Sequence, residues 1–165
     1  MPFGEFIEQH RVAVTPLAIH RERLAGPPIL GVVRAFSKRL VLIEGIGAAG
    51  RAGGFILIRR GDITRIDRGT ESLRLRLKAA GPVAKSHPIA REIDLAEWRN
   101  ALASAQRVSP ALLLHREGTG EPLLFASRSI ALTKHLVYGE RPEPGPDDEG
   151  EVAVDLDHLT RLDFA

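Results

Sequence analysis

The sequence predicts a mainly β protein with short helices, of the α+β class, made by tandem duplication of one small β-rich unit. Three features of the sequence support this prediction. The second half repeats part of the first half, short runs of β-branched residues are bounded by Gly and Pro, and an amphipathic helical segment precedes each set of runs. We expect the two units to pack about a pseudo-two-fold axis.

The repeat is visible when the chain is shifted by 96 residues, which aligns residues 35–67 with residues 131–163 without a gap. Nine of these 33 positions carry the same residue, where ordinary residue frequencies give about two by chance. Upstream, the tripeptide His-Arg-Glu at residues 20–22 recurs at residues 115–117. Pairs expected at equivalent places in the fold are Lys38 with Lys134, Thr64 with Thr160, and Arg65 with Arg161.

In the first unit the sequence predicts a helix followed by five strands. The helix covers residues 5–12. Alternating β-branched residues between Gly and Pro predict four of the strands, and the strict Leu/Arg alternation of residues 73–77 predicts a half-buried edge strand. The other four strands are expected at residues 17–22, 28–38, 39–45 and 54–60.

The second unit begins with a clearer helical pattern. Asp94 followed by Glu97 has the spacing of a capping box. The acidic, Pro-rich residues 141–150 predict a long surface loop. One helical stripe is formed by Leu95, Trp98, Leu102 and Ala105.

The expected organisation is a first lobe at residues 1–80, a linker at residues 81–92 and a second lobe at residues 93–165. The charge differs between the halves. Residues 1–91 contain 16 Lys and Arg against 7 Asp and Glu, whereas residues 92–165 contain 7 against 14. Opposite charge favours lobes that attract each other within a chain or between chains. A protein partner or self-association is therefore expected.

Composition excludes several classes of protein. With 44% hydrophobic and 27% charged residues the chain can bury a core. The absence of Cys excludes disulfides, thiolate metal sites and cysteine nucleophiles. No leader segment and no apolar run approaching about 20 residues is found, so we expect a cytoplasmic protein without membrane contact.

Residues 45–50 match the Gly-x-Gly-x-x-Gly pattern of dinucleotide sites. Such a site needs a helix directly after the glycines, because the helix N-terminus holds the pyrophosphate. Here Arg51 and three small residues lead straight into the strand predicted at residues 54–60. We therefore predict a hairpin loop and no nucleotide cofactor.

Two kinds of polar group were considered as catalytic or metal-binding candidates. His20 with Glu22, and His115 with Glu117, share a strand face, but two ligands do not make a metal site. Asp155, Asp157 and His158, near acidic residues 147–149, could gather a hard cation, but surface divergence between the copies is the favoured interpretation. No serine-hydrolase, zinc-protease or phosphate-loop motif occurs. We therefore predict no catalytic residue, no metal and no cofactor, with a metal-dependent enzyme as the third alternative.

A basic cluster in the first lobe is the candidate nucleic-acid site, although single-strand readers normally interleave aromatic side chains and only 5% of residues are aromatic. Alternating Arg residues, as at residues 73–77, are also typical of the solvent-exposed face of a strand that binds nothing. The cluster comprises Arg51, Arg59, Arg60, Arg65, Arg68, Arg74, Arg76 and Lys78.

The order of Gly31, Phe36, Leu40, Leu42 and the pair Arg60-Gly61 resembles the two motifs of the Sm and LSm small β-barrels. The resemblance covers residues 31–66. It implies a strongly bent, SH3-like barrel and an RNA-binding activity. In the family pattern Asp stands at the position of Ser37, and a base-contacting Asn at that of Val41.

These observations favour a non-catalytic binding or scaffold protein that acts through protein–protein contacts. The alternative is an Sm-like RNA-binding module that uses the basic first lobe.

Overall fold

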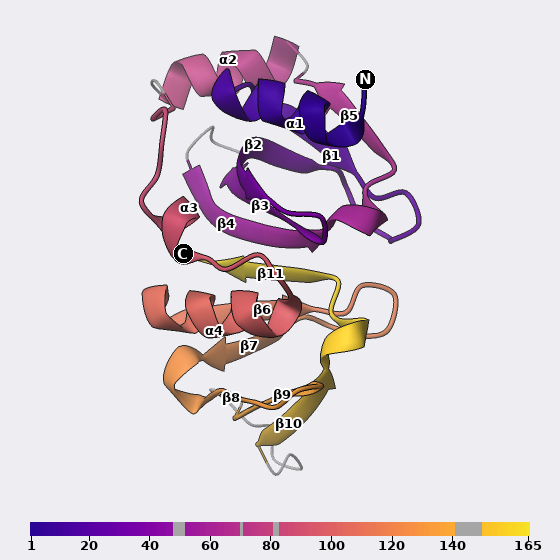
Figure 1. Ribbon diagram of the computed structural model, residues 1–165, viewed down its shortest axis with the longest axis vertical. Coiled ribbons are helices and arrows are strands. Elements are labelled where there is room, and N and C mark those ends of the chain that lie inside the picture. Colours follow the sequence, from indigo (N-terminus) through magenta and orange to yellow (C-terminus); the bar gives the residue numbers. More distant parts are fainter. Residues whose placement is uncertain (48–51, 70, 81–82, 141–149) are drawn as a thin grey trace.

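The structure, a computed structural model, describes residues 1–47, 52–69, 71–80, 83–140 and 150–165 (Figure 1). Its helices are α1 (Phe3–Val12), α2 (Glu71–Ala80), α3 (Ile89–Glu92) and α4 (Trp98–Val108), and its 3-10 turns are η1 (Arg60–Asp62), η2 (Ser127–Ser129) and η3 (Leu156–His158). The strands are β1 (Leu17–His20), β2 (Ile29–Phe36), β3 (Leu40–Ile46), β4 (Ala52–Arg59), β5 (Arg65–Arg68), β6 (Ala111–His115), β7 (Leu123–Ala126), β8 (Ala131–Leu132), β9 (Leu136–Glu140), β10 (Glu151–Asp155) and β11 (Arg161–Phe164). The protein is thus mainly β with short helices, as predicted.

The strands form two antiparallel sheets. The larger has eight strands in the order β5-β1-β2-β3-β4-β11-β6-β7, and the smaller has three in the order β10-β9-β8. Strand β11, the last of the chain, pairs with β4 on one side and β6 on the other. One sheet therefore crosses from the first lobe into the second (Figure 1).

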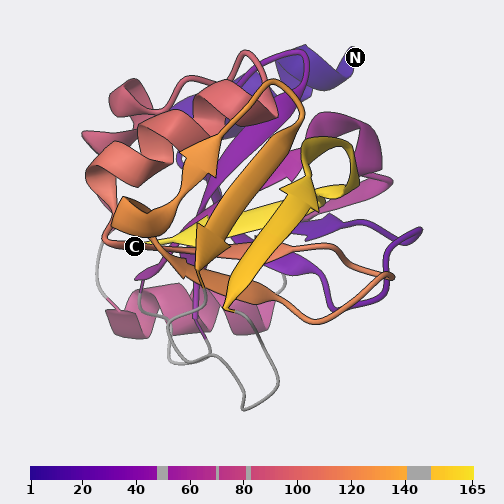
Figure 2. The same ribbon diagram turned by 90° about the horizontal axis from the view of Figure 1, so that it is seen from below.

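The expected closed barrels are not found, because both sheets are open. In the first lobe the outer edge of β4 pairs with β11 and not with β5. In the first lobe β2 is a single strand with a bulge. In the second lobe the equivalent segment is interrupted by η2, so that β7 belongs to the larger sheet and β8 to the smaller one. Figure 2 shows the smaller sheet at the end of the molecule that is nearest the viewer.

The expected pseudo-two-fold axis is also wrong. A two-fold axis would bring equivalent strands together, whereas β4 is the fourth strand of its lobe and its partner β11 is the last strand of the other. The lobes therefore meet through different surfaces, a heterologous arrangement.

Similar hydrogen bonds recur in the two lobes at positions 95 or 96 residues apart. The first bond closes the turn after β2 in the first lobe and after β8 in the second. The second fixes the start of the 3-10 turn that follows β4 or β10. The third joins the end of β1 or β6 to the residue before the last strand of its lobe. The three pairs are Ser37 N to Leu40 O (2.8 Å) with Thr133 N to Leu136 O (2.9 Å), Arg60 N to Arg39 O (2.8 Å) with Leu156 N to His135 O (2.8 Å), and Thr64 N to His20 O (2.9 Å) with Thr160 N to His115 O (2.9 Å).

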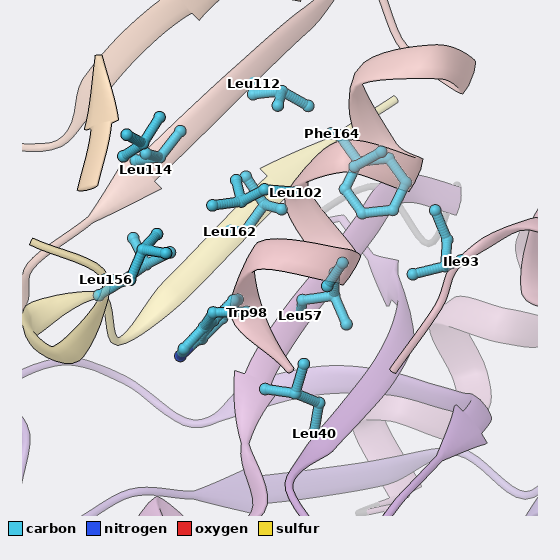
Figure 3. Packing of buried hydrophobic residues seen from close by; sticks show 14 of the residues in the cluster. Leu40, Leu57, Ile93, Trp98, Leu102, Leu112, Leu114, Leu156, Leu162 and Phe164 are labelled. Atoms are coloured by element: carbon cyan, nitrogen blue, oxygen red, sulfur yellow. The ribbon is translucent and has the colours of Figure 1, made fainter. Parts of the chain in front are cut away.

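Two hydrophobic clusters hold the fold together. The smaller lies within the first lobe, where Ile7 of α1 packs on Leu17, Val33 and Val41 of the sheet. The larger joins the lobes: Leu40 and Leu57 lie beside residues of α4 and β11 (Figure 3). Members that Figure 3 labels are Leu40, Leu57, Ile93, Trp98, Leu102, Leu112, Leu114, Leu156, Leu162 and Phe164. The expected boundary between lobes is therefore crossed by a shared core.

Residues 73–77 form part of α2 and not the predicted edge strand. In a strand Leu73 and Leu75 would share a face, but Leu73 is 1% exposed and Leu75 is 59% exposed. Leu, Arg, Lys and Ala favour helices, and the segment lacks the β-branched residues that favour strands. Alternation alone was a misleading signal here. In the expected linker, residues 89–92 form the short helix α3.

Helix α4 occurs as predicted, but its capping box does not. Glu97 is the N-cap residue and makes no capping hydrogen bond with its side chain. Asp94 accepts from Ala96 N (2.9 Å) and from Asn100 Nδ2 (2.8 Å), so it closes the turn before the helix. Within the part of the chain that the structure describes, no helix is long and apolar enough to cross a membrane.

Candidate functional site

The structure describes seven of the eight residues of the predicted basic cluster, and they lie on β4, η1, β5 and α2. Arg59, on β4, donates to the carbonyl oxygens of Leu156 (2.9 Å), Asp157 (2.6 Å) and Leu159 (2.9 Å), so it is part of the lobe junction. Arg60 lies over the ring of Phe3, 4.6 Å from its centroid.

The remaining residues of the basic cluster are divided between β5 and α2. Arg65 lies 3.3 Å from Glu22 and 3.4 Å from Asp67. Arg68 is exposed at the end of β5, and Arg74 and Lys78 are exposed on α2. Arg76 also belongs to α2, and Arg51 lies outside the described residues. The described residues of the cluster are therefore distributed over two strands, a 3-10 turn and a helix.

The His and the Glu of each candidate pair contact other residues and not each other. His20 Nε2 lies 2.8 Å from Asp67 Oδ2, and His115 Nε2 lies 3.2 Å from Asp163 Oδ2. Burial opposes ionisation of Asp163, but hydrogen bonds from His115 and Arg161 outweigh it and lower its pKa. These bonds tie the last strand of each lobe to its first, which is a structural role. Among the described residues, no three His, Asp or Glu side chains gather as a metal site.

The other predicted cation site is also occupied by structural contacts where it is described. Asp155 accepts from Asp157 N (2.8 Å) and so caps η3. The acidic residues 147–149 lie outside the described residues. The glycine pattern at residues 45–50 joins the antiparallel pair β3 and β4, so no helix follows it; residues 48–50 lie outside the described part.

The strongest polar constellation is at the lobe junction, where Arg21 meets Glu117. The two side chains are 6% and 15% exposed, and two N–O distances are 2.6 Å, a bidentate pair. Arg21 also approaches Thr160 O (3.4 Å), and Thr160 Oγ1 lies 2.9 Å from Glu117. Burial opposes ionisation of Glu117, but Arg21 and the Thr160 hydroxyl outweigh it and lower its pKa. The pair therefore remains charged at neutral pH.

Backbone pairing extends the same junction. Strands β4 and β11 pair in the register Arg161–Ile58, Leu162–Leu57, Asp163–Ile56 and Phe164–Phe55. The rings of Phe55 and Phe164 stack with centroids 5.6 Å apart. One lobe thus binds the other by strand addition, an apolar core and a buried ion pair.

A cavity of about 410 Å³ opens beside this junction, between Lys38, Arg59, Asp62, Trp98 and Asp157. Within the described residues, Asp62 Oδ2 and Trp98 Nε1 are buried without a hydrogen-bond partner. Burial raises the pKa of Asp62, although the nearby Arg59 and Arg21 counteract it. Both positive and negative side chains line this cavity, so its charge does not indicate which class of ligand would bind there.

A second hollow, of about 470 Å³, is more uniform in charge. We call it the basic groove; it lies between α1, β2 and the segment that leads into α3. Arg34 forms its floor, with Nε donating to Glu44 (2.6 Å) and Nη1 to Ala84 O (2.8 Å). Its lining residues with charged or aromatic side chains are Glu8, Arg11, Arg34, Phe36, Lys85, His87 and Arg91.

Comparisons with protein-family models, with curated proteins and with solved structures found no match for this chain.

Arg21, Lys85 and Arg91 were missed as site residues by sequence reasoning. A signal existed for Arg21, because His-Arg-Glu occurs in both lobes and only two of its three residues were considered. Nothing in the sequence places Lys85 and Arg91 beside Arg34, since they come from different elements.

Proposed function

We propose that this chain is a non-catalytic binding protein, built by duplication of one small β-rich unit, that acts as a scaffold through contacts with other proteins. The observation that carries the proposal is the junction between β4 and β11. It displays within one chain how such a unit binds another protein surface. Strand addition to a sheet edge is a common mode of protein recognition.

Two further observations support this function. Of the candidate catalytic groups, His20, His115 and Glu117 are engaged in contacts that join strands or lobes, and Glu22 lies 3.3 Å from Arg65. The outer edge of β5 and that of β10 end their sheets, so in the described part neither pairs on that side. Unpaired backbone groups on an edge strand are available to another chain.

The recurring hydrogen bonds and the repeated sequence support the duplication. Thr64 and Thr160 donate to the carbonyl oxygens of the repeated His20 and His115. We expect the two lobes to superpose in the register that the shift of 96 residues defines. A crystal structure in which they superpose only in another register would contradict the duplication and its small-barrel ancestry.

The binding function is tested with the immobilised full chain and an extract of its source organism. A variant with Arg68→Pro at the exposed end of β5 and Ala153→Lys on β10 blocks these two edges, because prolines and lysines on edge strands prevent strand pairing. Leu75→Lys, at an exposed position of α2, is the matched control. We expect mass spectrometry to identify proteins that the parent and the control retain and the edge variant loses. Equal retention by all three, or no retention, would exclude the proposed mode.

The basic groove favours nucleic acid as a second candidate function. Arg11, Arg34, Lys85 and Arg91 line it. Glu8 pairs with Arg11 (2.6 Å) and Glu44 pairs with Arg34, so Lys85 and Arg91 carry the positive charge that remains for a ligand. Phe36 supplies an aromatic side chain for base stacking. This set differs from the cluster predicted from the sequence but belongs to the same basic half of the chain.

Binding of single-stranded RNA near 50 mM salt, about the low end of the range where phosphate contacts are measured, tests this candidate. We expect Lys85→Gln with Arg91→Gln to weaken binding and reduce its salt dependence, and Arg99→Gln with Arg107→Gln at exposed positions of α4 to have little effect. Neutralising Asp147, Asp148 and Glu149, which lie outside the described residues, should strengthen binding by removing negative charge that repels phosphate. If the parent and the neutralised variant both ignore RNA, this candidate is wrong.

A further inference from the structure

We infer that this chain binds a second copy of itself head to tail, with strand β10 of one copy pairing antiparallel with strand β5 of the next. The partner of the proposed scaffold is then another molecule of the same chain, so this self-association rests on the proposed function.

The internal junction uses one surface from each lobe, and among the described strands the equivalent surfaces on β5 and β10 have no strand partner. With the shift of 96 residues, β4 corresponds to β10 and β11 corresponds to β5. Because β4 pairs with β11, the matching unused pair is β10 and β5. These two strands lie toward opposite ends of the long axis of the molecule (Figure 1). A second copy added at one end therefore presents the same free strand again at the other end.

The internal register also fixes the register between copies. Shifting its four pairs by 96 residues places Arg65 opposite Val154, Ile66 opposite Ala153, Asp67 opposite Val152, and Arg68 opposite Glu151. In the internal junction, the position of this last pair is held by the stacked Phe164 and Phe55. Between copies, an ion pair of opposite charge would replace that aromatic contact.

Charge on the free edge of β10 favours this replacement. Glu151 lies directly opposite Glu140 of β9, and both side chains are exposed. Like charges at such a cross-strand position destabilise the pairing. Arg68 of a second copy, next to Glu151, would relieve the repulsion.

The buried ion pair of the internal junction has an equivalent as well. Arg21 corresponds to Arg116 and Glu117 corresponds to Glu22 in the repeated tripeptide. Within the described residues, Arg116 Nε is buried without a hydrogen-bond partner. Glu22 is exposed and lies 3.3 Å from Arg65. Arg116 of one copy meeting Glu22 of the next would reproduce the bond that holds the lobes together.

Two side chains on β5 and β10 are more exposed than their equivalents at the internal junction, as expected for strands that could bind a partner. Leu162 of β11 is fully buried, whereas its equivalent Ile66 of β5 is only half-buried. Leu57 of β4 is fully buried, whereas its equivalent Ala153 of β10 is exposed. Leu57 and Leu162 belong to the larger hydrophobic cluster, whereas Ile66 packs at the margin of the smaller one and Ala153 belongs to neither. Docking β10 on β5 would cover the remaining pair in the same way.

Repeated head-to-tail contacts close into a ring when the rotation per copy allows it and otherwise extend as a filament. Both outcomes give particles heavier than the 18.0 kDa chain. Sedimentation velocity of the full-length chain over a concentration series therefore measures the association.

The matched variants are Glu151→Arg and Arg68→Glu, both at exposed positions, so the fold should tolerate them. Each places like charges opposite each other between copies, and we expect about tenfold weaker association, the effect of about 1.4 kcal/mol. An equal mixture of the two variants restores opposite charges at every contact and should restore association. Glu92→Arg on α3 makes the same change of charge away from both edges and should have no effect.

The inferred contact is overturned if the parent sediments as an 18.0 kDa monomer at its highest soluble concentration. It is also overturned if the parent associates but neither variant weakens the association, or if mixing fails to restore it. Retention of a different protein through the edges by a monomeric parent leaves the scaffold function standing and rejects a second copy as partner. A monomeric parent with no edge-dependent partner rejects both.

Discussion

At the scale of single residues, the polar side chains with the most buried contacts lie at the junction between the lobes. Arg21 and Glu117 form a bidentate pair across the junction, and Arg59 donates to three carbonyl oxygens of the opposite lobe. A buried ion pair gains little over apolar packing, but removing one partner leaves a buried charge that nothing compensates. The energetic effect of these residues therefore appears when one of them is removed.

Arg21→Ala should destabilise the protein by about 3 kcal/mol because Glu117 then remains buried and charged without its cation. For a chain of this size the midpoint of thermal unfolding should fall by roughly 6–12 °C, measured by circular dichroism. Arg65→Ala is the control, because Arg65 is 54% exposed and its ion pairs are solvated, so it should cost less than about 1 kcal/mol. Equal effects of the two substitutions would contradict the assigned role of Arg21.

The same pair gives the parent a defined dependence on pH. The pKa of Glu117 in the folded state lies below 4.5, its ordinary value. Its contribution to stability is therefore fully present above pH 4.5 and is lost as the pH falls through the lower folded pKa. Arg21→Ala should reduce this loss, because the carboxylate no longer has its cation. Parallel curves of unfolding free energy against pH for parent and variant would exclude the effect.

Asp62 should show the opposite sign. Burial raises its pKa above 3.8 in the folded state, so its effect on stability becomes unfavourable as the pH rises through that folded pKa. We expect Asp62→Asn to be more stable than the parent at pH 7, with the difference vanishing toward pH 3, roughly where both states of the parent are protonated. Urea unfolding at both pH values measures it. A less stable variant at pH 7 would indicate a favourable contact of the carboxylate.

At the scale of elements, close approach of strands matters as much as side-chain pattern. Gly31 of β2 lies opposite Gly45 of β3, and a Cβ at Gly31 would collide with the backbone oxygen of Glu44. Phe125 lies against Gly139 in the same manner in the second lobe. These glycines let strands and rings approach where the sheets bend.

Gly31→Ala should therefore cost about 1–3 kcal/mol, because the backbone of β3 must move. Gly61→Ala is the matched control, since a Cβ there would meet nothing within 4 Å. Both free energies of unfolding are measured in urea at neutral pH. A cost for Gly31→Ala no larger than that for Gly61→Ala would show that β2 and β3 can separate easily.

At the scale of the whole molecule, the two lobes depend on each other. The larger cluster contains Leu40 and Leu57 from the first lobe together with Trp98, Leu162 and Phe164 from the second. Strand β11 also supplies the hydrogen-bond partners of β4. Separation of the lobes would expose this core and both strand edges at once.

We therefore expect that neither lobe folds when it is produced as a separate chain, residues 1–92 or residues 93–165, so neither should show a cooperative unfolding transition. Co-expression of the two fragments should give a folded complex. Leu162→Asp in the second fragment should abolish the complex, because it puts a charge into the shared core. Gel filtration and thermal unfolding measure both results. Two fragments that fold alone and do not bind each other would show that the expected domain boundary is real.

The sequence by itself determined most of the local structure. Segments with β-branched residues between Gly and Pro became β1 to β4, and the amphipathic stripe through Trp98 became α4. These elements follow from side-chain periodicity, which needs only neighbours along the chain. Where periodicity and propensity disagreed, as at residues 73–77, propensity was correct and alternation was wrong.

Only the tertiary structure decided how these elements meet. Pairing of β4 with β11 joins positions about 100 residues apart, and no local pattern specifies which of several similar strands takes an open edge. The same pairing replaced the expected two-fold axis, left the larger sheet open, and put Arg59 into the junction between the lobes. Arg21 and Glu117 were separated in the sequence by a whole lobe, so their contact depends on long-range packing that sequence periodicity does not encode.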